Sequence, residues 1–89
     1  MAEHSDAYII GRLIERSRLL IAISEEIPVE TKLQAQPLLK QLEQALAVPP
    51  EEQDQDRIRG TYAALYGEVG DDADLEALLS ALKNFVPCL

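Results

Sequence analysis

Aromatic residues are scarce in this chain of 89 residues, which has no Trp, one Phe and three Tyr. A surface that stacks successive bases needs several rings, so this scarcity argues against single-stranded nucleic-acid binding. Basic residues are also scarce, because 8 Lys and Arg stand against 16 Asp and Glu, for a formal charge of −8. Such a charge repels phosphate backbones and anionic headgroups. We therefore expect no direct contact with nucleic acid and none with a membrane surface.

Residues that carry covalent or metal chemistry are equally few. His4 is the only histidine and Cys88 the only cysteine, and a nucleophilic thiol needs a neighbouring base or a lowered pKa. The glycines are isolated, so the chain has no glycine-rich phosphate loop. The acidic runs lack the spacing and the central glycine of a calcium loop. The sequence therefore predicts no catalytic residue, no metal site, no cofactor and no small-molecule substrate, and hence not an enzyme.

Long apolar runs are missing as well. No stretch approaches the roughly 18 residues that span a bilayer. The acidic start, Met1-Ala2-Glu3, has no basic region of the kind that opens a secretion signal. A single cysteine allows no disulfide within the chain. Together these features predict a reducing, cytoplasmic location.

The apolar content, 47% of the chain, is sufficient for a folded domain. At this length we expect one domain, residues 1–89, with residues 1–4 and 87–89 as tails. No stretch alternates apolar and polar residues as a strand does, and the apolar positions recur at helical spacing. The sequence predicts an all-α fold: a small four-helix bundle or an orthogonal array of four helices.

The helical pattern covers residues 5–24, 29–47 and 51–69, and a last segment from Asp71 or Asp72 to about residue 85. Ser5 or Asp6 can cap the first segment. We expect five leucines to be buried together: Leu13, Leu42, Leu65, Leu78 and Leu82.

The second segment contains Pro37, and the phase of its apolar residues changes there. Val29 and Leu33 lie on one side, and the apolar residues after Pro37 lie nearly opposite. Proline inside a helix removes one backbone hydrogen bond and clashes with the carbonyl four residues back. We therefore expect this helix to be kinked or broken near Pro37.

The first helix carries more apolar surface than one side of a helix needs. Opposite its main stripe, at spacings of three and four residues, lies a second face formed by Tyr8, Arg12, Arg16, Leu19 and Ile23. Tyr and Arg beside aliphatic residues are typical of protein interfaces. The alternative is that this helix is central and that Leu19 and Ile23 are buried by another helix.

Acids concentrate in the second half of the chain: residues 41–89 have ten acids and three bases, and residues 1–40 have six and five. They form two runs, Glu51, Glu52, Asp54 and Asp56, and Asp71, Asp72, Asp74 and Glu76. Such runs either keep the surface soluble or steer the chain to a basic surface on a partner.

These features favour a non-enzymatic protein–protein interaction module: an adaptor, an assembly subunit or a chaperone-like protein. We expect it to self-associate, most simply as a homodimer built around the first helix. The alternative is an acidic inhibitor or nucleic-acid mimic that blocks a basic site on a partner, as a phage-type anti-defence protein would. An enzyme would need a pocket at which residues such as Arg12, Glu15 and Tyr62 converge.

Overall fold

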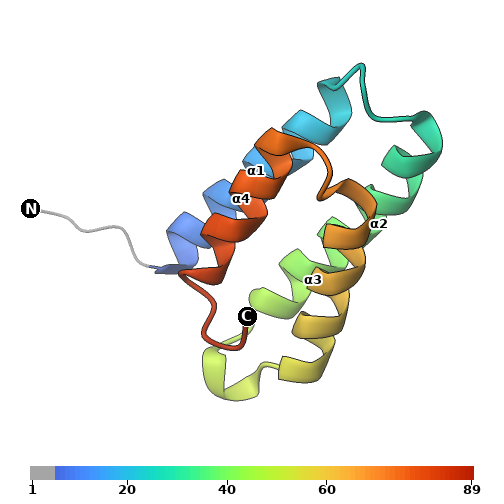
Figure 1. The fold of residues 1–89 in the computed structure, drawn as a ribbon. Coiled ribbons are helices and arrows are strands. Elements are labelled where there is room, and N and C mark those ends of the chain that lie inside the picture. Colours follow the sequence, from blue (N-terminus) through green and yellow to red (C-terminus); the bar gives the residue numbers. More distant parts are fainter. Residues whose placement is uncertain (1–5) are drawn as a thin grey trace, which may run out of the picture.

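The computed structural model describes residues 6–89, so His4, Ser5 and the predicted tail 1–4 lie outside the described residues. The described chain forms four α-helices, α1 (Asp6–Ile23), α2 (Val29–Leu46), α3 (Gln55–Val69) and α4 (Ala73–Lys83), with a 3₁₀ turn, η1 (Pro50–Glu52), before α3. Successive helices run in alternate directions (Figure 1). Residues 6–89 contain no strand, and the predicted all-α class is confirmed.

Two aspartates set where the last two helices begin. A carboxylate oxygen of Asp54 accepts a hydrogen bond from the backbone N–H of Arg57 at 3.1 Å. Asp72 Oδ1 accepts from the N–H groups of Asp74 and Leu75. Because a capping aspartate satisfies the free N–H groups of a first turn, α3 begins after Asp54 and not at the acids before it. Those acids, Glu51 and Glu52, lie in η1.

The core receives one stripe of side chains from each helix. The buried apolar residues are Ile14 and Ile21 from α1; Ala35, Leu39, Leu42 and Ala45 from α2; Ile58, Tyr62, Leu65 and Val69 from α3; Leu75, Leu79 and Leu82 from α4; and Ile27 and Val86 from the adjoining segments. Of the five predicted core leucines, Leu42, Leu65 and Leu82 are buried and Leu13 packs half-buried at the margin. Leu78 is also only half-buried, because Leu79 occupies the inward position.

The predicted break at Pro37 is wrong, because α2 is one continuous helix with Pro37 inside it. Pro37 lies on the exposed side of α2, where the carbonyl that loses its helical bond can bind water. The change of apolar phase has another outcome: Val29 and Leu33 are left in solvent, each 69% exposed. A kink without a break stays a prediction.

The C-terminal residues pack back onto the helices. Cys88 and Leu89 are half-buried against the core, and the N–H of Leu89 donates to the carbonyl of Val86 at 3.0 Å. The segment expected to be a tail, residues 87–89, therefore covers part of the core. It lies at the end of α4, beside α3 (Figure 1).

Replacing Pro37 by Ala should raise the free energy of unfolding by about 1–3 kcal/mol, because α2 regains a hydrogen bond and loses a steric clash. Urea unfolding followed by circular dichroism measures this change. Gln41→Ala, at an exposed position of the same helix, is the matched control and should change stability by less than about 0.5 kcal/mol. Destabilisation by Pro37→Ala would show that the proline is required by the helix.

Truncating a core leucine should be far more costly than truncating an exposed one. Leu82 is 2% exposed and Leu33 is 69% exposed. Leu82→Ala should lower the free energy of unfolding by about 2–5 kcal/mol, because it leaves a cavity. Leu33→Ala should change it by less than about 0.5 kcal/mol. Equal effects in urea unfolding would contradict this assignment of the core.

Candidate functional site

The second face of α1 is exposed to solvent. Tyr8, Leu19 and Ile23 are 45%, 54% and 62% exposed, and Arg12 and Arg16 between them are exposed as well. The core lies against the opposite side, where Ile14 and Ile21 are buried. The alternative in which another helix covers Leu19 and Ile23 is therefore wrong for this chain.

Two hydrogen bonds fix how α1 lies against α2. Lys32 Nζ donates to the carbonyl oxygen of Ala22 at 3.1 Å, and Gln36 Nε2 donates to the carbonyl oxygen of Arg18 at 3.5 Å. These contacts place residue 22 beside residue 32 and residue 18 beside residue 36, as in an antiparallel helical hairpin.

This register brings four exposed aliphatic residues to the outer side of the hairpin. On α1, Leu19 directly follows Arg18 and Ile23 directly follows Ala22. On α2, Val29 precedes Lys32 and Leu33 precedes Gln36, each by about one turn. Residues at these spacings flank the line of contact on a helix surface. We call Leu19, Ile23, Val29 and Leu33 the hairpin face.

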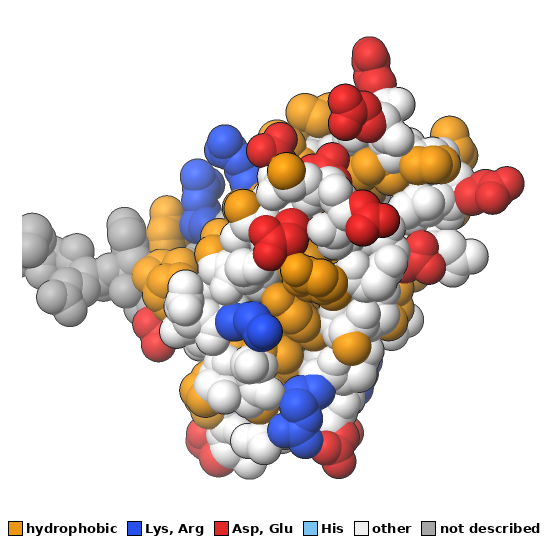
Figure 2. Space-filling model, viewed as in Figure 1, with side chains coloured by type: hydrophobic (Ala, Val, Ile, Leu, Met, Phe, Trp, Pro, Cys, Tyr) orange, Lys and Arg blue, Asp and Glu red, His pale blue; other side chains and the backbone are white. Residues whose placement is uncertain are grey.

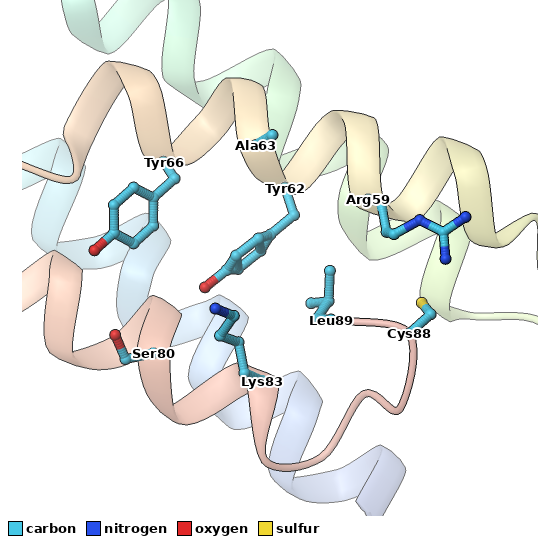
Figure 3. Close-up of a pocket in the computed structure, with 8 residues that line it drawn as sticks. All are labelled: Arg59, Tyr62, Ala63, Tyr66, Ser80, Lys83, Cys88 and Leu89. Atoms are coloured by element: carbon cyan, nitrogen blue, oxygen red, sulfur yellow. The ribbon is translucent and has the colours of Figure 1, made fainter.

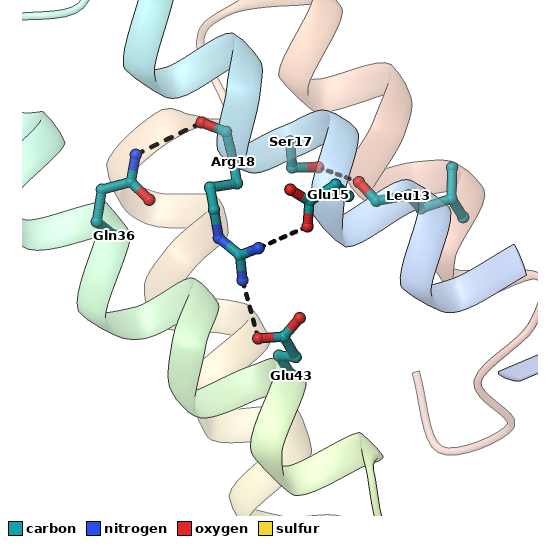
Figure 4. Close-up of polar contacts among 6 residues, drawn as sticks. All are labelled: Leu13, Glu15, Ser17, Arg18, Gln36 and Glu43. Atoms are coloured by element: carbon teal, nitrogen blue, oxygen red, sulfur yellow. Dashed lines mark hydrogen bonds and ion pairs between the residues drawn. The ribbon is translucent and has the colours of Figure 1, made fainter. Parts of the chain in front are cut away.

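Arg18 holds the hairpin together from its own side chain (Figure 4). Its two terminal nitrogens contact Glu15 Oε2 at 2.6 Å and Glu43 Oε1 at 2.9 Å. The Arg18 side chain keeps 34% of its exposure, so each pair contributes less than about 1 kcal/mol. The Glu43 contact ties α1 to the last turn of α2, whereas the Glu15 contact lies within α1 and holds the Arg18 side chain in place.

Charged residues of opposite sign lie at the two ends of the hairpin face. Arg12 and Arg16 precede it on α1, and Glu25, Glu26 and Glu30 lie where the chain passes from α1 to α2. All five are exposed, and within residues 6–89 none of their charged groups has an ion-pair partner. Figure 2 shows acidic side chains gathered toward the end of the molecule that carries the α1–α2 loop, and basic side chains farther along.

The structure does not join the two acidic runs into one row. The run at residues 51–56 lies at the start of α3, with Asp56 in its first turn, and the run at residues 71–76 follows its end. The two runs are therefore at opposite ends of a 15-residue helix, about 20 Å apart. Several of these acids have structural partners: Asp54 and Asp72 cap helices, Asp56 pairs with Arg59, and Glu76 accepts from Tyr66 and Ser80.

A shallow groove of about 420 Å³ lies between α3, α4 and the C-terminal residues (Figure 3). Its lining residues are Arg59, Tyr62, Ala63, Tyr66, Ser80, Lys83, Cys88 and Leu89. The tyrosine rings lie with centroids 6.1 Å apart. Tyr62 donates to the carbonyl of Leu79 at 2.6 Å, and Tyr66 donates to Glu76 Oε1 at 3.1 Å. Arg12 and Glu15 lie on α1 and do not reach this groove.

The two tyrosines are poor acid–base groups at neutral pH. Burial raises the pKa of Tyr62 above its ordinary value, and the hydrogen bond to Glu76 raises the pKa of Tyr66. Both phenols therefore stay protonated. Cys88 lines the same groove, and no histidine or carboxylate lines it with Cys88.

The described residues form neither a metal site nor a membrane-spanning helix. Residues 6–89 place no three His, Cys, Asp or Glu side chains where they could hold a metal ion. The described helices include none with the length and apolarity needed to cross a bilayer.

The sequence prediction missed the groove and the contacts of Arg18. The spacing of Arg59, Tyr62 and Tyr66 is a helical signal that could have indicated a shared face of α3. The Arg18–Glu43 contact joins residues 25 positions apart, and no local pattern indicates such a pair. Val29 and Leu33, which the change of phase leaves outside the buried stripe, belong with the second face of the first helix to the apolar residues expected to form an interface.

The chain matches no family model, and comparisons with curated proteins and with solved structures find no match.

Removing the Tyr62 hydroxyl tests whether the groove wall depends on its buried hydrogen bond. Tyr62→Phe should lower the free energy of unfolding by about 1 kcal/mol, because a buried bond of 2.6 Å is lost. Tyr66→Phe removes a solvent-exposed bond and serves as the matched control with a smaller loss. If urea unfolding finds the two losses equal, the Tyr62 bond has no special role.

Proposed function

We propose that this protein is a non-enzymatic interaction module that self-associates through the hairpin face. The observation that carries the proposal is the exposure of four neighbouring aliphatic side chains, between 54% and 69%. Single exposed leucines are ordinary, but adjoining ones on a fixed scaffold are typical of interaction sites.

A second copy is the occupant that the face fits most simply. A two-fold interface brings the same patch from both copies together, so an aliphatic patch meets an aliphatic patch without a further partner. Removing this surface from water supplies the driving force. Four side chains per copy form a small apolar centre, and we expect a modest dimer with a dissociation constant on the order of micromolar.

The arrangement of the helices supports this role. The alternating directions favour a four-helix bundle over an orthogonal array, and a bundle presents two neighbouring helices along one side. The loop between α1 and α2 is fixed by the buried Ile27 and by the bond from Ser24 N to Leu20 O at 3.0 Å. The hairpin face is therefore preformed, which lowers the entropy cost of docking.

The alternative, an acidic inhibitor or nucleic-acid mimic, has weaker support. A mimic of a phosphate backbone needs carboxylates in one continuous row, whereas the two acidic runs lie at opposite ends of α3. Several of their members are also engaged as helix caps or ion pairs. The cytoplasmic location and the absence of enzymatic activity remain predictions.

Sedimentation velocity over a range of concentrations tests the proposal. The wild type should shift from monomer to dimer at tens of micromolar, a range that suits a modest interface. The double variant Leu19→Glu, Ile23→Glu should stay monomeric, because four like charges would meet at the centre of the dimer.

The matched control is Ala64→Glu, Ala77→Glu, which adds the same two charges at exposed positions of α3 and α4. It should dimerise as the wild type does. A wild type that remains monomeric throughout this range would rule out self-association.

A further inference from the structure

The charged side chains beside the hairpin face change sign from one end of the face to the other. Arg12 and Arg16 precede the apolar residues, and Glu26 and Glu30 follow Ile23. The two arginines lie on the same exposed side of α1 as Leu19 and Ile23, at spacings of three and four residues. Along the outer side of the hairpin the order is therefore basic, apolar, acidic.

This order is self-complementary under one kind of two-fold rotation. An axis that crosses the outer side of α1 at the level of Ile21 places Leu19 opposite Ile23 of the second copy. The same rotation brings Arg16 toward the α1–α2 loop of the second copy, which carries Glu26. Because α2 runs back beside α1, with residue 32 next to residue 22, Glu30 lies at the same acidic end, and the rotation brings that end toward the basic end that carries Arg12 and Arg16. A basic end thus meets an acidic end twice, once on each side of the apolar centre.

The other two-fold arrangement lacks this match. An axis parallel to α1 would align the two helices in parallel, with Arg12 and Arg16 beside their own copies and the glutamates beside theirs. Like charges in contact disfavour that arrangement. The free monomer gives these side chains no competing partners, since within residues 6–89 they form no ion pairs.

We infer that the hairpin face takes a second copy of this chain in one orientation, with the two α1 helices antiparallel. In this dimer the basic end of each copy, with Arg12 and Arg16, faces the acidic end of the other, with Glu26 and Glu30. The inference rests on the proposed self-association and adds its register. The apolar centre supplies affinity, and exposed ion pairs, which are individually weak, select the orientation.

A charge-exchange experiment tests this register with two double variants. One is Arg12→Glu, Arg16→Glu, which makes both ends of the outer side acidic. The other is Glu26→Arg, Glu30→Arg, which makes both ends basic. Each variant alone should dimerise at least about tenfold more weakly than the wild type, because every charge contact becomes repulsive. An equimolar mixture should form a heterodimer about as tight as the wild-type dimer.

The matched control is Arg57→Glu, Lys83→Glu, which changes two exposed bases away from the hairpin face and should dimerise as the wild type does. Circular dichroism establishes that each variant is folded.

The outcomes separate the register from the self-association beneath it. Heterodimers from the mixture, together with weakened homodimers from each variant, support the antiparallel register. A wild-type dimer whose affinity is unchanged by either variant, or a mixture that stays monomeric, overturns the register and leaves self-association standing. A monomeric wild type overturns both, and a foreign partner would then have to cover the face.

Discussion

A chain of this size has one interior, and each of its four helices can turn only one stripe of side chains toward it. This constraint determines what lies on the surface. Helices α3 and α4 match it, because their buried residues form single stripes and the remaining sides carry polar residues, alanines and Tyr66, whose hydroxyl donates to Glu76. The α1–α2 hairpin exceeds it, because both helices carry aliphatic residues outside the buried stripe. Those residues have no place inside the monomer, and their exposure is the basis for the proposed function.

The helices could be predicted because spacing and capping are local properties. Apolar periodicity gave all four, and Asp72 was one of two expected caps for α4. The errors came where tertiary packing outweighed the local signals. At Pro37 the proline and the change of phase together indicated a break, but burial of Ala35, Leu39 and Leu42 along one continuous stripe outweighs one lost hydrogen bond. Leu78 and Leu79 are adjacent in sequence, and only packing against the other helices decides which one turns inward.

The candidate site was only partly predictable for the same reason. The sequence shows that Leu19 and Ile23 lie opposite the main stripe, and it leaves open whether another helix covers them. That question depends on which helices are neighbours, a tertiary property that α1 alone does not encode. The structure answers it by packing α4 and α2 against the other sides of α1. The alignment of Val29 and Leu33 with the α1 residues likewise depends on the register that Lys32 and Gln36 establish.

The chain uses its arginines in two different ways, and the difference connects the fold to the proposed dimer. Arg18 faces α2 and is paired with Glu15 and Glu43, so its charge serves the hairpin itself. Arg12 and Arg16, six and two residues earlier, point away from the neighbouring helices and have no ion-pair partner in the described chain. Because these side chains and the hairpin face contribute little to the folded monomer, they can be changed with little effect on the fold. Association and stability therefore depend on separate sets of residues, which is why the charge-exchange variants can test the register without unfolding the chain.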